Sequence, residues 1–243
     1  MSDSILNLEA VKVAIQGADV LRGVSLVVPR GGLVALVGRN GAGKTTTLRS
    51  VMGLLPLIAG RISVDGVDLA QIPAFRRAQL GIGYMPEDRR LIGRLTVADN
   101  LLLPAWSGGA ANAAGRLEYI YGLMPDLAAL AARKAAQLSG GQQKMAALAR
   151  ALMSATKLLL LDEPFEGLAP IVVEELTAAI RRMIAERSNA FVLVEQHAEI
   201  ALPLTENVIV LERGRIVHRG LSTQLLANHA ALERLIGLKL AEV

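Results

Sequence analysis

The chain of 243 residues contains no cysteine, and only 3% of its residues are aromatic. No disulfide can therefore staple the fold, so its stability must come from a packed core, which a chain of this length can bury. The few aromatic residues argue against a platform for stacking single-stranded bases. The sequence also lacks an apolar run of the roughly 18 residues that a membrane-spanning helix needs, and it begins without the pattern of a signal peptide. We therefore expect a cytosolic protein that does not span the membrane.

Charged residues are spread along the chain with a small positive excess. The formal net charge is +4 and the isoelectric point is about 9.7. Such an excess can attract nucleic acid or an anionic membrane surface, but charges without a basic cluster are typical of a solvated surface. We expect no nucleic-acid partner, and the excess suits a protein that binds polyphosphate beneath a membrane.

Short apolar segments alternate with segments of helical character, which predicts an α/β fold with a parallel sheet. Residues 5–28 have the pattern of an antiparallel β subdomain, and a further hairpin is expected around residues 213–214. Helix formers over residues 110–136 predict an inserted helical subdomain, with a new helix at Pro125. The other expected strands are 33–37, 61–64, 157–162 and 191–195, and the other expected helices are 45–55, 140–153 and 170–186. We expect a single domain over residues 1–243, with a core of about 1–90 and 155–243 and a helical subdomain of about 91–154.

Residues 38–45 read G-R-N-G-A-G-K-T, which matches the phosphate-loop pattern G-x-x-x-x-G-K-[ST] between a predicted strand and a predicted helix. Glycines let the backbone N–H groups wrap around phosphate, and the positive end of the following helix adds to the attraction. Lys44 would reach the β- and γ-phosphates, and the hydroxyl of Thr45 would ligate Mg²⁺. The residues expected to bind the nucleotide here are Gly38, Arg39, Asn40, Gly41, Ala42, Gly43, Lys44, Thr45 and Thr46.

Asp162 and Glu163 directly follow the apolar strand at residues 157–161. A buried parallel strand that ends in acid places carboxylates in the crevice where α/β sheets bind ligands. We expect Asp162 to hold Mg²⁺ and Glu163 to orient or deprotonate the attacking water. Together with the phosphate loop, this pair predicts a nucleoside triphosphatase.

Residues 138–142 read L-S-G-G-Q and open a predicted helix, which makes a second anion site. This string is the signature of the ABC (ATP-binding cassette) ATPases, which the chain resembles over nearly its whole length. The resemblance implies that this motif faces the ATP of a second ABC ATPase subunit, identical or similar, in a head-to-tail dimer. The residues so implied are Ser139, Gly140, Gly141 and Gln142.

Four further residues follow from the resemblance. Glu87 lies where the family usually has the glutamine that links Mg²⁺ to the transmembrane partner. Gln196 lies where many members have a histidine that contacts the γ-phosphate, and His197 is an alternative for that role. Ile15 lies where the family usually stacks an aromatic residue on adenine, which predicts looser base binding.

The strings PEDRRL, TVADNL, LLLLDEPFEGLAP and LVEQ are similar to those of ATPases that serve bacterial branched-chain amino acid importers. The resemblance implies ATP and Mg²⁺ as cofactors, transmembrane permease subunits and, indirectly, a periplasmic substrate-binding protein as partners, and a peripheral location on the cytoplasmic face of the inner membrane. Import of urea or short amides and export of lipid or lipopolysaccharide are alternatives. Two further alternatives are a regulatory subunit with an inactive site and a soluble ABC ATPase that acts on nucleic acid.

Overall fold

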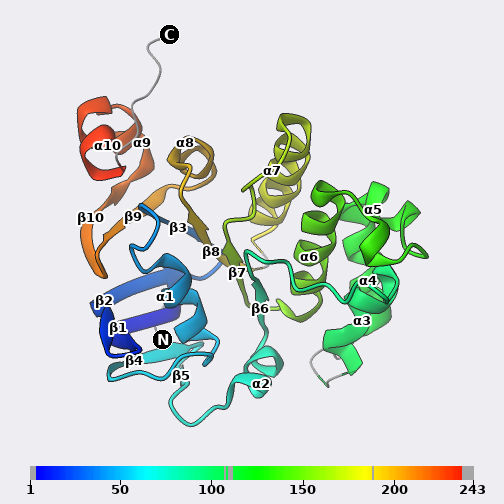
Figure 1. Cartoon of the computed structure of the whole chain (residues 1–243), viewed down its shortest axis with the longest axis horizontal. Helices are drawn as coiled ribbons and strands as arrows, with labels where there is room; N and C mark the ends of the chain where they lie inside the picture. The colour runs from blue at the N-terminus through cyan, green and yellow to red at the C-terminus, as the bar shows by residue number, and fades with distance from the viewer. Residues whose placement is uncertain (1–3, 107, 109–111, 188, 237–243) are drawn as a thin grey trace. The chain divides into compact units, whose positions relative to one another are not determined.

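The computed structural model describes residues 4–106, 108, 112–187 and 189–236 (Figure 1). The described residues form two compact units. The first unit is built from the segments before Phe75 and after Asn189, and the second is Phe75–Asn189. Within the described residues, no helix combines the length and the apolar character that crossing a membrane requires.

An antiparallel sheet forms one part of the first unit, as the sequence pattern predicted. Its strand order is β2-β1-β4-β5, and its strands are β1 (Ser4–Ile15), β2 (Ala18–Pro29), β4 (Ala59–Val64) and β5 (Val67–Asp68). The first two strands are joined at Gln16 and Gly17, which both have positive φ angles of 50° and 83°. Two such residues in a row make the tight turn whose twist suits a hairpin.

Parallel strands form the other part of the first unit. The strand β3 (Leu33–Val37) pairs in parallel with β8 (Ala190–Glu195) on one side and β9 (Asn207–Glu212) on the other. All five residues of β3 are buried. They are all apolar because a parallel strand that is covered on both faces has no side exposed to water. The last strand, β10 (Arg215–Leu221), is antiparallel to β9 and completes the predicted hairpin.

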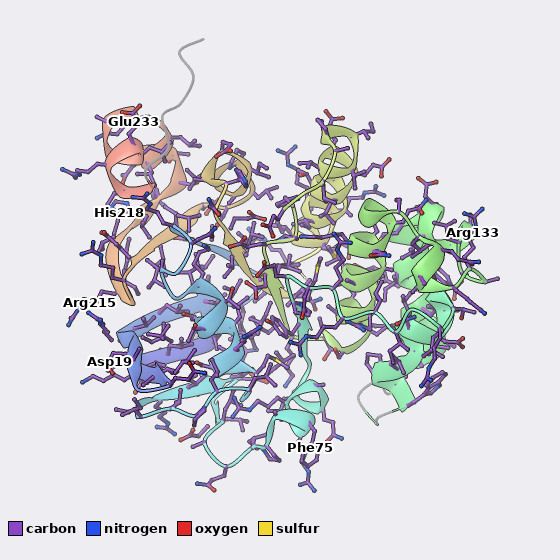
Figure 2. The ribbon with its side chains drawn as sticks, viewed as in Figure 1. Asp19, Phe75, Arg133, Arg215, His218 and Glu233 are labelled. Carbon is purple, nitrogen blue, oxygen red and sulfur yellow. The ribbon has the colours of Figure 1, made fainter. Side chains whose placement is uncertain are left out.

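The helices of the first unit are short. The helix α1 (Lys44–Val51) follows the phosphate loop and ends four residues before the predicted end, ahead of Gly53 with its φ of 69°. The remaining elements are α8 (Ala198–Ala201), η3 (Leu202–Leu204), α9 (Ser222–Leu226) and α10 (His229–Ile236). Exposed side chains such as those of Asp19 and Arg215 project away from the ribbon (Figure 2).

The second unit contains a pair of parallel strands and most of the helices (Figure 1). The strands are β6 (Ile82–Met85) and β7 (Leu158–Asp162). The helices are α2 (Ala74–Arg77), which begins one residue before the unit, η1 (Ala78–Leu80), α3 (Val97–Trp106), α4 (Ala113–Leu123), α5 (Pro125–Ala129), η2 (Ala135–Gln137), α6 (Gly140–Ser154) and α7 (Pro170–Ala185). The predicted helices at 140–153 and 170–186 are confirmed, and Pro170 occupies the first turn of α7.

Four elements of the second unit were not predicted, namely α2, η1, β6 and α3, and one predicted stretch is more broken than expected. The helix α3 contains Pro104, which removes a backbone donor and obscures a helical pattern. The strand β6 spans only four residues. The helical stretch predicted over residues 110–136 is divided among α4, α5 and η2, with Pro125 opening α5 as predicted; its first residues, 110 and 111, lie outside the described part of the chain.

Candidate active site

The predicted phosphate loop joins β3 to α1 in the first unit, and two of its glycines are required by close contacts. A Cβ atom on Gly38 would lie 2.3 Å from the carbonyl oxygen of Leu211. One on Gly43, whose φ is 109°, would lie 2.8 Å from the side chain of Leu21. These glycines therefore let the loop lie directly against neighbouring chain, while Gly41 has nothing within 4 Å of such an atom.

Lys44 is the first residue of α1, and only 4% of it is exposed. Its ammonium donates hydrogen bonds to two carbonyl oxygens of the loop, that of Gly38 at 2.8 Å and that of Arg39 at 3.3 Å. The charge is thus held inside the curve of the loop. Lysine is a common ligand for phosphate because its ammonium is a compact charge with three donors.

The other loop residues differ in exposure. Arg39, Asn40 and Gly41 are exposed, and Thr45 and Thr46 are half-buried in the first turn of α1. Helix N-termini attract anions because their first N–H groups have no partner within the helix. The first unit therefore presents a buried cation, two hydroxyl groups and a helix N-terminus at one loop.

Gln196 lies at the same sheet edge as the phosphate loop. Val37 pairs in parallel with Glu195, so the residues that follow, Gly38 and Gln196, leave their strands side by side. His197 is different: its side chain is 47% exposed, and its ring Nδ1 lies 3.1 Å from a carboxylate oxygen of Glu199. The structure therefore brings the glutamine next to the loop and engages the histidine elsewhere.

Ile15, the residue at the expected adenine position, is the last residue of β1. It pairs with Ala18 across the hairpin turn, and 37% of it is exposed. An isoleucine at the rim of a sheet offers an apolar contact but no aromatic face.

The second unit carries the acidic strand end. Asp162 closes β7 and is fully buried. One of its carboxylate oxygens accepts a hydrogen bond from the hydroxyl of Tyr84 at 3.1 Å, a contact that the sequence did not reveal. Because Met85 pairs in parallel with Leu161, Glu87 also follows its strand at this edge, where it is exposed.

Glu163 has an unusual backbone and an unpredicted partner. Its φ is 47°, in the left-handed region that residues other than glycine rarely adopt. Its carbonyl oxygen accepts a hydrogen bond of 2.6 Å from the ammonium of Lys144 in α6, and only 1% of that lysine is exposed. No local signal in the sequence indicated this contact, because α6 also carries Gln142, Gln143 and Arg150 among its apolar residues.

The signature motif opens α6. The side chain of Ser139 accepts a hydrogen bond from the N–H of Gln142 at 3.3 Å, and the side chain of Gln142 accepts one from the N–H of Ser139 at 3.0 Å. This reciprocal capping box fixes the first turn of the helix. Ser139 and Gly140 are exposed, and a Cβ on Gly141 would meet Val172 at 3.0 Å. The string thus forms a rigid helix N-terminus, open on one side.

Two arginines hold the loop after β6 to this helix. Arg89 donates to the side chain of Gln143 at 2.9 Å. The guanidinium of Arg150 donates to the carbonyl oxygens of Arg89 and Arg90 at 2.6 Å each. Both acceptors have positive φ angles, 60° and 50°, so the half-buried charge of Arg150 supports a strained turn.

The oxygen donors fit a magnesium ion better than a metal held entirely by protein. Within the described ranges, no group of three or more His, Cys, Asp or Glu side chains is placed to hold a metal. Mg²⁺ typically takes one or two protein oxygens and completes its shell with water and substrate phosphates. The first unit offers one donor of that kind in the hydroxyl of Thr45, and the second offers one in the buried carboxylate of Asp162.

A glycine loop between a buried parallel strand and a helix, together with a parallel strand that ends in Asp-Glu, defines a P-loop nucleoside triphosphatase. The sequence profile of the family described as ABC transporter matches residues 21–166. The chain belongs to the ABC transporter family, and it is an ATP-hydrolysing subunit of a transporter.

Curated relatives span most or all of the chain. The high-affinity branched-chain amino acid transport ATP-binding protein BraG of Pseudomonas aeruginosa is 36% identical over 96% of this chain and its own full length. A probable branched-chain amino acid transport ATP-binding protein, LivF of Archaeoglobus fulgidus, is 32% identical over 89% of this chain and 91% of its own. The lipopolysaccharide export system ATP-binding protein LptB of Escherichia coli is 35% identical over 88% of this chain and 90% of its own.

Solved structures confirm the fold. The ADP conformation of an ATP-binding cassette of an ABC transporter matches 97% of this chain and 99% of its own, with a TM-score of 0.83 and 25% identity. The structure of an ATP-binding subunit of an ABC transporter matches 96% of this chain and 98% of its own, with a TM-score of 0.82 and 28% identity.

Proposed function

We propose that this chain powers the import of branched-chain or other hydrophobic amino acids. The observation that carries this proposal is the similarity to BraG along that protein's whole length, at 36% identity. The similarity to LivF supports it. An ATPase subunit does not itself bind the cargo, so the cargo is inferred by analogy.

Export of lipopolysaccharide is the second candidate, because LptB is nearly as similar, at 35% identity. The two functions differ in the permease that the chain binds and in the direction of transport. Both use the same ATPase chemistry.

We assign roles to the site residues on their chemistry and on the family resemblance. The loop 38–46 with Lys44 binds the phosphates of ATP through backbone N–H groups and the ammonium. Glu163 accepts a proton from the attacking water or orients it, and Gln196 contacts the γ-phosphate through a neutral amide. The exposed, carboxylate-paired His197 is then outside the reaction.

In this proposal the residues that would hold Mg²⁺ are Thr45, Asp162 and Glu87. When bound, the ion neutralises charge that develops on the phosphates. The hydroxyl of Tyr84 keeps the carboxylate of Asp162 in one orientation through its hydrogen bond of 3.1 Å. This buried carboxylate needs such a donor, because a buried charge must be paired or hydrogen-bonded.

The working unit in this proposal is a head-to-tail dimer, with this chain or a similar one as partner. Ser139, Gly140, Gly141 and Gln142 of each chain bind the nucleotide held by the other chain, using the rigid helix N-terminus described above. The helical subdomain of about residues 91–154 carries this signature. Closure of the dimer pulls on the permease at the cytoplasmic face of the membrane, and a periplasmic substrate-binding protein supplies the cargo.

Uptake measurements in the cell that encodes the chain test the cargo. Deletion of the gene should abolish ATP-dependent uptake of radiolabelled leucine, isoleucine and valine. The wild-type chain should restore the uptake, and Glu163→Gln, made at the same level, should not. Unchanged leucine uptake in the deletion strain, with lipopolysaccharide depleted from the cell surface, would instead identify the exporter.

Light scattering on the purified Glu163→Gln chain tests the dimer. We expect binding without hydrolysis, and therefore a shift from monomer to dimer only when ATP and Mg²⁺ are present. A variant that binds ATP but remains monomeric would exclude pairing between two copies of this chain.

A further inference from the structure

The ammonium of Lys144 lies in the interior of the second unit. Lysine is almost never fully buried unless its charge is paired or hydrogen-bonded, and only 1% of this residue is exposed. Its Nζ donates to the carbonyl oxygen of Glu163 at 2.6 Å. A buried ammonium without compensation is strongly unfavourable. Breaking this hydrogen bond would therefore lower the stability of the fold.

The acceptor of this hydrogen bond belongs to a strained residue. With its φ of 47°, Glu163 turns the chain sharply just after β7. Such a conformation persists only when the surroundings hold it in place. The N–H of Glu166 also approaches the same carbonyl oxygen, at 3.4 Å, which is a long hydrogen bond. The short bond from Lys144 is therefore the stronger of these two restraints on the backbone that directs the carboxylate of Glu163.

Lys144 also belongs to the signature helix. It lies five positions after Ser139, on a helix whose first turn is fixed by the capping box of Ser139 and Gln142. A displacement of that helix would carry the lysine with it, because side chains within a helix move with its backbone. The same side chain therefore joins the signature to the loop of Glu163.

We infer that Lys144 is a positioning residue that couples the two ATP sites of the dimer through a single chain. This inference rests on the proposed dimer, in which the signature contacts the partner's nucleotide and Glu163 acts on the chain's own. Binding of nucleotide at the signature then stabilises the position of α6 and, through Lys144, the reactive orientation of Glu163. Each site is fully active only when the other is filled.

Substitution of Lys144 separates this role from a purely structural one. Lys144→Met is one atom shorter, stays unbranched and removes the donor, and Lys144→Arg keeps a donor. Arg116→Met is the matched control, because Arg116 also donates to a backbone carbonyl in this unit, that of Leu152 at 2.9 Å, but far along α6 from Glu163. The ATPase rate is measured against ATP concentration and normalised to the folded fraction.

For Lys144→Met we expect kcat to fall at least tenfold, the KM for ATP to change by less than threefold, and the Hill coefficient to fall towards 1. Lys144→Arg should recover most of the rate and the cooperativity. Arg116→Met should lose stability, while its kcat per folded molecule and its Hill coefficient stay within experimental error of the wild type. Lys144→Leu, which also lacks a donor, replaces the methionine variant if that variant does not fold, with the same expected changes.

A kcat per folded molecule within twofold of the wild type, with unchanged cooperativity, would overturn the role of Lys144. If the Glu163→Gln chain forms its ATP-dependent dimer in that case, only this inference fails and the proposed function stands. If the Glu163→Gln chain does not pair, the proposed dimer fails first and the coupling between two sites fails with it.

Discussion

Replacing Ile15 by tyrosine should tighten nucleotide binding. The residue lies at the rim of β1 and is 37% exposed, so a larger side chain can extend into solvent without displacing the core. We expect the free energy of unfolding to change by less than about 0.5 kcal/mol, as for most surface substitutions. A change in the affinity of this variant for nucleotide would therefore report the contact with the base and not a loss of stability.

The size of the gain follows from the contact that the ring would add. Stacking of a base on an aromatic side chain contributes about 1–3 kcal/mol relative to alanine. Isoleucine already supplies an apolar contact, so the gain should lie near the lower end, at about 1 kcal/mol. This corresponds to a dissociation constant that is roughly fivefold lower, since about 1.4 kcal/mol equals a factor of ten.

Calorimetric titration with ADP measures this effect without hydrolysis. Val27→Tyr is the matched control, because Val27 lies in the adjacent strand β2 and is 53% exposed. We expect Ile15→Tyr to bind ADP and GDP more tightly and Val27→Tyr to bind both like the wild type. An ADP affinity within twofold of the wild type in folded Ile15→Tyr would show that this position does not contact the base.

Three other substitutions test the packing around the site. Tyr121→Phe should raise the free energy of unfolding by about 1 kcal/mol and the melting temperature by about 2–4 °C. The reason is that the hydroxyl of Tyr121 has no hydrogen-bond partner among the described residues, and burial raises the pKa of this phenol. A lower melting temperature would contradict this. Arg150→Met should lower the free energy of unfolding in urea by about 2–4 kcal/mol and speed tryptic cleavage in the loop 88–90, because two hydrogen bonds from a half-buried charge are lost. Arg150→Lys should be intermediate, and unchanged cleavage would show that the loop is held by other contacts. Gly38→Ala should weaken ADP binding more than Gly41→Ala, because a methyl group on Gly38 would lie 2.3 Å from a backbone carbonyl, whereas one on Gly41 meets no atom and is opposed only by the φ of 77°. Equal effects would show that the contact at Gly38 adds nothing to that backbone strain.

Much of the fold and of the candidate site could be predicted from local sequence. The phosphate loop, the acidic strand end and the signature are contiguous strings, and their chemistry depends on residues next to one another in the chain. The strands β3, β7 and β8 are equally local signals, because a strand buried on both faces must be apolar at every position. Helices such as α7 are predictable from a proline at the first turn and a regular apolar face.

Contacts between segments distant in the chain were decided only by the tertiary structure. The hydrogen bond between Tyr84 and Asp162 joins residues 78 positions apart, and Arg150 reaches a carbonyl 61 positions away. The strain at Glu163 and the burial of Lys144 arise in the same way, since neither residue type signals them locally. The sequence alone therefore determined which chemical groups this ATPase possesses, because these reside in short motifs. Tertiary packing decided how those groups are oriented, because a side chain's direction and charge state depend on partners that only folding brings within hydrogen-bonding distance.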